Sequence, residues 1–143
     1  MNIKDVTRFL ADIFPQAFPA GSHPFVVERI DHGRVELSLL AGEEHLRPGG
    51  TVSGPAMMTL ADLAMYVLVL SHKGPEALAV TTNLNINFLR KPPPGRLVAR
   101  ANMLKMGRSL AVGDVTISGE GEANAIVAHA TVTYSIPPEQ GRK

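Results

Sequence analysis

The sequence predicts an α+β fold in which a curled, mostly antiparallel sheet wraps around one long central helix. Three observations lead to this prediction. The apolar run from Ala56 to Leu70 has the length and the Ala, Met and Leu content of a helix, although a pair of strands is the alternative. The run is apolar on nearly every side, so protein should surround it. Later segments alternate polar and apolar residues, as half-buried strands do.

The expected elements, in chain order, are a short helix, two strands, the long helix and four strands. The short helix, from Ile3 to about Phe14, follows from apolar residues at helical spacing that Pro15 ends. A loop rich in Pro and Gly follows it. The chain is expected to form a single domain, residues 1–143, with a helix and loop over 1–22 and a tail over 137–143. The strands are expected at residues 25–30, 34–40, 80–89, 97–106, 109–118 and 123–136.

Composition narrows the classes of function. The formal net charge is +1, without the clustered basic residues of a nucleic-acid-binding protein, and there is no cysteine for disulfides or thiolate chemistry. The five histidines lack metal-ligand spacing, so neither a metal nor another cofactor is expected. The N-terminus does not resemble a signal peptide, and the apolar run is shorter than the roughly 20 residues that cross a bilayer. We therefore expect a soluble, cytoplasmic protein with no nucleic-acid or membrane partner.

Asp62 is the one charged carboxylate inside the long apolar run. Between Pro48 and Ser71 no other acidic or basic residue occurs. Burial of a lone carboxylate is costly unless it is paired, hydrogen-bonded or protonated. Two interpretations stay open from the residues alone: a structural carboxylate bound to a backbone N–H or a lysine, or a functional group.

Gly54 stands where the long helix is expected to begin. The N-terminus of a helix presents free N–H groups and a partial positive charge, and a glycine lets a carbonyl approach closely. This arrangement suits an oxyanion hole, although the glycines here also suit simple turns. Asp62 lies roughly 12 Å further along the helix axis, so one chain cannot easily bring both to one carbonyl. A dimer with two sites at its interface is therefore expected.

These residues resemble a motif of the hotdog-fold acyl-CoA thioesterases, in particular the PaaI-like (phenylacetate-degradation) group. That family has a stretch similar to H-x-N-x-x-G-x-x-H-G-G followed by T-L-x-D, and the resemblance extends over roughly residues 43–136. The chain departs from the motif at three positions, where Arg47 replaces the asparagine, Ser53 the histidine and Pro55 the second glycine. The matching positions are His45, Arg47, Gly50, Ser53, Gly54, Pro55, Thr59, Leu60 and Asp62.

The resemblance implies a hotdog fold and hydrolysis of an acyl-CoA by a homodimer or homotetramer. Asp62 would be the general base or the nucleophile, Gly54 would donate its N–H to the oxyanion, and Thr81 would lie near the water. Arg47 would reach a carbonyl, a CoA phosphate or Asp62 itself. The other residues expected to contact substrate are Gly50, Ser53 and Met58, together with Arg90, Lys91 and Arg108 for the CoA phosphates.

Two other functions remain as alternatives. The three departures from the motif favour a non-hydrolytic hotdog protein that binds an acyl-CoA or a lipid. A hotdog hydratase or dehydratase would pair the aspartate with a histidine a few residues later. Because residues 63–67 contain no histidine, this last alternative is the least favoured.

Overall fold

The computed structural model describes residues 1–15, 24–121 and 125–138, and its elements follow the expected order. Most of the expected loop before the first strand, the start of the expected last strand and the residues after 138 lie outside the described part. The elements are α1 (Ile3–Ile13), β1 (Phe25–Asp31), β2 (Arg34–Ala41), a short 3₁₀ helix η1 (Glu43–His45), α2 (Gly54–Lys73), β3 (Val80–Phe88), β4 (Gly95–Met106), β5 (Leu110–Gly119) and β6 (Ile126–Ser135).

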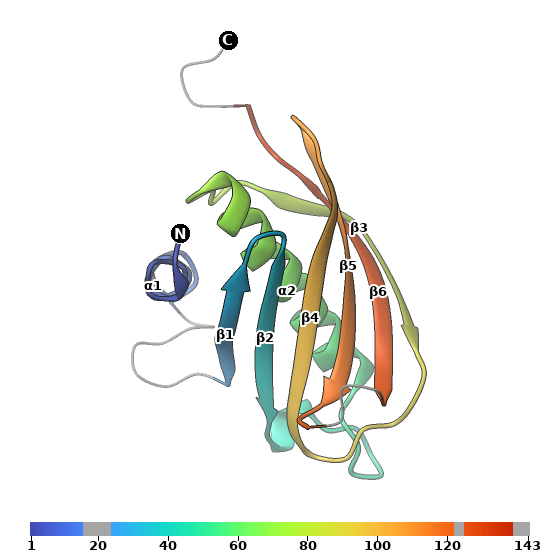
Figure 1. Ribbon diagram of the computed structural model, residues 1–143. Coiled ribbons are helices and arrows are strands. Elements are labelled where there is room, and N and C mark those ends of the chain that lie inside the picture. The colour runs from blue at the N-terminus through green and yellow to red at the C-terminus, as the bar shows by residue number, and fades with distance from the viewer. Residues whose placement is uncertain (16–23, 122–124, 139–143) are drawn as a thin grey trace.

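The six strands form one curled sheet in the order β1-β2-β4-β5-β6-β3, and every neighbouring pair is antiparallel. The concave side of the sheet wraps around α2 (Figure 1). This confirms the predicted fold class, a hotdog fold with a short N-terminal helix. Strand β3 follows α2 in the chain, and among the described strands it pairs only with β6, so one of its backbone edges is open.

Helix α2 is the centre of the core. It begins two residues earlier than expected because Ser53 caps it, accepting a hydrogen bond from the Ala56 N–H at 3.2 Å, and Gly54 occupies the first helical position. It ends at Lys73, and the capping residue Gly74 has a φ of +88°, which suits glycine. With 20 residues α2 is apolar and long enough to cross a membrane by composition alone, but most of it is buried inside the sheet. We therefore interpret α2 as a core helix.

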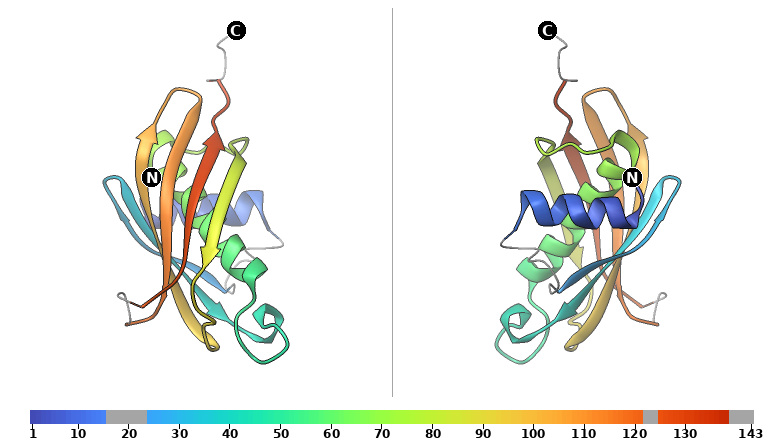
Figure 2. Two further views of the ribbon diagram at one scale, coloured as in Figure 1. Left: turned by 90° about the vertical axis from the view of Figure 1, so that its right-hand side faces the viewer. Right: turned by 90° about the vertical axis from the view of Figure 1, so that its left-hand side faces the viewer.

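Helix α1 lies on the side of α2 that the sheet leaves open, next to β1 (Figure 2). Val6 and Leu10 are fully buried beneath it, and Asn2 and Asp5 form a reciprocal capping box at its start. These contacts fix the helix on the core. Its last turn therefore brings Phe14, which follows the final helical residue, over the side of α2.

A β-bulge near the start of β3 decides which side chains face the helix. Simple alternation along this strand puts Thr81 on the same side as Asn83, Asn85 and Asn87. In the structure the register with β6 shifts between Thr81 and Asn83. Beyond the bulge the asparagines pair with Thr133, Thr131 and His129, whereas Thr81 pairs with Tyr134 and faces α2. The strand was correctly predicted, but the side expected for Thr81 was wrong.

Candidate active site

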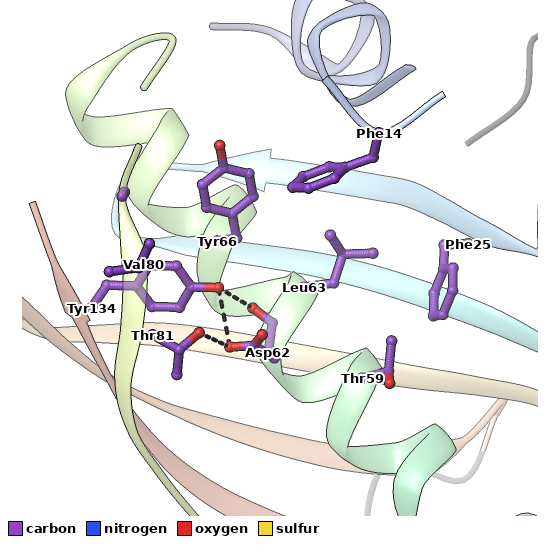
Figure 3. A pocket seen from close by; sticks show the side chains of 10 residues that line it. Phe14, Phe25, Thr59, Asp62, Leu63, Tyr66, Val80, Thr81 and Tyr134 are labelled. Atoms are coloured by element: carbon purple, nitrogen blue, oxygen red, sulfur yellow. Dashed lines mark hydrogen bonds between the residues drawn. The ribbon is translucent and has the colours of Figure 1, made fainter. Parts of the chain in front are cut away.

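A pocket of about 340 Å³ opens along the exposed side of α2, and Asp62 lies in its wall. Four aromatic rings and several aliphatic side chains make the pocket mostly apolar. Its walls come from α2, β3, β6, the end of α1 and the start of β1 (Figure 3). The lining residues are Phe14, Phe25, Thr59, Asp62, Leu63, Tyr66, Ala79, Val80, Thr81 and Tyr134.

Asp62 is half-buried, and two hydroxyl groups hold its side chain. Thr81 Oγ1 donates to Asp62 Oδ1 at 2.6 Å, and the Tyr134 hydroxyl donates to the same oxygen at 3.0 Å. The Tyr134 hydroxyl also lies 3.1 Å from the backbone carbonyl oxygen of Asp62. In the described part of the chain Asp62 has no cationic partner, and its Oδ2 accepts no hydrogen bond. The carboxylate is thus oriented by hydroxyls and keeps one oxygen for the pocket.

The two tyrosines of the chain form one wall of this pocket. Their rings stack with centroids 5.8 Å apart and an interplanar angle of 20°. The Tyr66 hydroxyl donates to the Glu76 carbonyl at 2.8 Å, and Phe14 contacts the Tyr66 ring edge-on at 6.2 Å. Neither tyrosine was predicted as a site residue. A signal was present for Tyr134, because alternation along β6 puts its phenol on the buried side, where the hydroxyl needs a partner.

Both phenols should stay protonated to a higher pH in the folded protein than in the unfolded chain. Burial, and secondarily Glu76, raises the pKa of Tyr66 to about 12, and burial together with the Asp62 charge raises the pKa of Tyr134 further. An unfolded tyrosine ionises near pH 10. The folded state therefore holds protons that the unfolded state loses, so the free energy of unfolding should fall as pH rises from about 10 to about 12.

Alkaline titration checks this prediction. Tyrosinate absorbance should appear only above pH 10 in the folded protein and near pH 10 in denaturant. The absence of tryptophan makes the signal simple to assign. Two tyrosinates with a midpoint near pH 10 in the folded protein would contradict the expected burial.

Gly54 lies in a second pocket, of about 390 Å³, at the N-terminal end of α2. Three of the predicted substrate-binding cations, Arg47, Arg90 and Lys91, line it together with Phe88 and Met57. The Gly54 N–H makes no hydrogen bond within the described part of the chain. A Cβ at this position would lie 3.3 Å from Phe88 Cζ. The pocket therefore combines one unpaired N–H at the start of a helix with positive side chains, a combination that suits an anion.

The remaining predicted site residues lie outside both pockets. Ser53 caps α2, and Gly50 closes a turn in which its N–H donates to the Arg47 carbonyl. Arg108 is exposed in the turn between β4 and β5. Met58 belongs to the apolar run that protein was expected to surround, but in the single chain it is 41% exposed, whereas Met57 is 3% exposed. A substrate contact for Gly50, Ser53, Met58 and Arg108 stays a prediction.

The structure separates two groups that the sequence left as possible partners. Asp62 and Arg47 line different pockets, and Arg47 forms no ion pair among the described residues. Asp62 and Gly54 are likewise separated, as their spacing along the helix requires. Over residues 1–15, 24–121 and 125–138, no three His, Asp or Glu side chains gather as metal ligands would.

Comparison with known proteins agrees with the fold and the motif. Residues 49–126 match the family model described as Thioesterase superfamily. A candidate esterase of Thermoplasma acidophilum is 30% identical over 99 residues, which cover 68% of this chain and 74% of that protein. The crystal structure of a candidate thioesterase from Silicibacter sp. TM1040 is 47% identical, with a TM-score of 0.85, over 96% of this chain and 93% of that one.

A third relative supports the narrower assignment to the PaaI-like group. The structure of a candidate thioesterase from Ralstonia eutropha JMP134, described as related to phenylacetic acid degradation, is 29% identical with a TM-score of 0.75. The match covers 90% of this chain and 98% of that one. Fold and relatives together define a hotdog-fold hydrolase. The chain belongs to the thioesterase superfamily, and within it to the PaaI-like proteins.

Proposed function

We propose that this protein hydrolyses an acyl-CoA, or a related acyl thioester, with Asp62 as the catalytic carboxylate. One observation carries the proposal: Asp62 lies in an apolar pocket, held by two hydroxyls, with an oxygen left over for chemistry. A structural carboxylate bound to a lysine or a backbone N–H was the other interpretation of the sequence. In the structure the donors to Asp62 are instead side-chain hydroxyls, and Asp62 borders a cavity large enough for an acyl group.

The reaction needs one base or nucleophile and one oxyanion donor. In the general-base route Asp62 takes a proton from water as the water oxygen attacks the thioester carbonyl. The carbonyl oxygen becomes negative and is stabilised by the Gly54 N–H. When the C–S bond breaks, the thiolate leaves and takes up the proton, giving a free acid and a thiol. In the nucleophilic route Asp62 attacks the carbonyl carbon and the C–S bond breaks, which expels the thiolate and leaves a mixed anhydride. Water then cleaves the anhydride, so that the free acid leaves, the Asp62 carboxylate is restored and the thiolate takes up a proton from the water.

The separation of Asp62 from Gly54 supports a site shared by two subunits. Strand β3 has an open backbone edge, and the apolar side chains of Val80 and Phe88 are exposed along it. An exposed apolar edge strand is suited to pairing with another copy. We propose a homodimer in which Asp62 of one subunit faces Gly54 of the other. Further pairing into a tetramer, and a cytoplasmic location, stay predictions.

A thiol-release assay tests the proposed activity. Purified protein is mixed with a panel of short, medium, long and aryl acyl-CoAs, and the free thiol is titrated. Turnover of at least one ester is expected. If no ester on the panel releases thiol, calorimetry with the same esters separates the alternatives, because tight binding without turnover would favour the non-hydrolytic acyl-CoA or lipid-binding function.

Arg47, Arg90 and Lys91, which line the pocket around Gly54, are the expected contacts for the phosphates at the nucleotide end of CoA. Arg47→Ala should raise KM for an acyl-CoA roughly 5- to 10-fold, because a partly exposed charge-assisted contact with phosphate is lost. The same variant should hardly affect the corresponding acyl-pantetheine, which lacks the nucleotide phosphates. Arg8→Ala, which removes an exposed charge on α1 outside both pockets, is the matched control. Equal effects of Arg47→Ala on both thioesters would contradict this placement.

A further inference from the structure

Tyr134 is the more buried of the two residues whose hydroxyls contact Asp62. Tyr134 is 4% exposed, whereas Thr81 is exposed and Asp62 is half-buried. The three side chains come from three elements, Tyr134 from β6, Thr81 from β3 and Asp62 from α2, and they meet at one carboxylate oxygen (Figure 3). The orientation of Asp62 therefore depends on groups outside its own helix.

Both hydroxyls converge on the same oxygen. Thr81 and Tyr134 donate to Oδ1, and Tyr134 also reaches the Asp62 backbone carbonyl. A donor placed between the side-chain and main-chain oxygens of one residue restricts the rotation of that side chain. Because Oδ1 is occupied in this way, Oδ2 is the oxygen that remains for a proton or a carbonyl carbon.

Contacts with neighbouring residues hold the ring of Tyr134 in place. Its ring stacks on Tyr66, whose own hydroxyl is bound to the Glu76 carbonyl. The phenol stays protonated at neutral pH because burial raises its pKa, so it keeps a proton to donate to Asp62. A fixed ring and a permanent donor suit orientation rather than proton transfer.

We propose that Tyr134 is a positioning residue, which, together with Thr81, holds Asp62 so that Oδ2 is directed at the reacting water or carbonyl. This inference rests on the proposed hydrolysis by Asp62. It adds a residue that the family motif does not contain and assigns different roles to the two carboxylate oxygens.

Tyr134→Phe tests the inference, since it removes one oxygen and keeps the stacked ring. We expect kcat to fall roughly 10- to 100-fold with KM changed by less than about 3-fold, because a misoriented base affects the chemical step more than binding. Tyr66→Phe is the matched comparison: it removes a hydroxyl from the same stack but not from Asp62, so its loss should be clearly smaller. An equal loss in the two variants would overturn the inference.

Coupling between the two residues gives a second measurement. If Tyr134 acts through Asp62, then adding Tyr134→Phe to Asp62→Asn should cause little further loss of kcat. Thr81→Val, which removes the other hydroxyl donor at an exposed position, should likewise lower kcat rather than raise KM. Fully additive losses of Tyr134→Phe and Asp62→Asn would show that Tyr134 acts independently of Asp62, against the proposal.

Crystallography separates failure of this inference from failure of the proposed function. In Tyr134→Phe the Asp62 side chain should occupy more than one orientation, whether or not any thioester is hydrolysed. An inactive wild type with a reoriented Asp62 in the variant would contradict the function alone. An unchanged Asp62 in the variant would overturn the positioning role even if the wild type is active.

Discussion

Asp62→Asn should lower kcat/KM for any accepted thioester by at least about 100-fold, since general-base catalysis contributes about 10²–10⁴-fold. The amide has nearly the shape of the carboxylate, and its oxygen can still accept from Thr81 and Tyr134. The pocket should therefore keep its form while the base or nucleophile is lost. Steady-state thiol release measures the loss, and thermal unfolding of the variant shows that the fold is retained.

Asp114→Asn is the matched control for this substitution. Asp114 lies on β5 and contacts His129 at 3.3 Å, and neither residue lines the two pockets. The same chemical change at Asp114 should leave kcat/KM within about 2-fold, as expected for a surface substitution. If Asp62→Asn keeps near wild-type activity, or if Asp114→Asn loses as much, Asp62 is not the catalytic carboxylate.

The order of elements and the fold class were predictable because they depend on periodicity that the sequence displays. The long apolar run, the alternation along the last strands and the turn residues between them each indicate one element. The buried side of β6, with Val132 and Tyr134, follows from that alternation and is confirmed. The end of α2 at Lys73, beyond the predicted Leu70, was missed because the added turn contains polar residues such as His72.

The contacts of Asp62 were not predictable to the same degree. The bulge after Thr81 is a local change in strand register, and nothing in the alternation of side chains reveals it. The partner of the Tyr134 hydroxyl depends on how β6 packs across α2, a tertiary contact between positions 72 residues apart in the chain. The resemblance suggested Thr81 near the site, but only the register shift after Thr81 explains why its side chain faces Asp62.

Surface and core could not be separated along α2 from composition alone. Protein was expected to surround the whole apolar run, yet Met58 within it is exposed in the single chain. An apolar side chain that faces a pocket or another subunit has the same sequence signature as one in the core. For the same reason the pairing of subunits needs a test that depends on two chains.

A pair of inactive variants supplies that test. Gly54→Pro removes the proposed oxyanion donor at the first helical position, and the extended Ser53 before it (φ −73°, ψ 156°) suits a following proline. Because the change places two prolines in succession at the start of the helix, thermal unfolding and circular dichroism must show that the variant keeps its fold. Loss of one oxyanion donor costs about 10²–10³-fold in kcat. Gly54→Ala keeps the N–H and adds only a methyl 3.3 Å from the half-exposed Phe88 ring. It should therefore retain most activity.

Mixing Asp62→Asn with Gly54→Pro should restore activity that neither variant has alone. When the two chains are refolded together, half of the dimers are mixed. If each site takes Asp62 from one subunit and Gly54 from the other, a mixed dimer has one doubly altered site and one intact site. About a quarter of all sites should then work, so thiol release should return to about a quarter of the wild-type rate. Sites built within one protomer would give no recovery, because each protomer would still lack one of the two groups, and the shared-site geometry would be excluded.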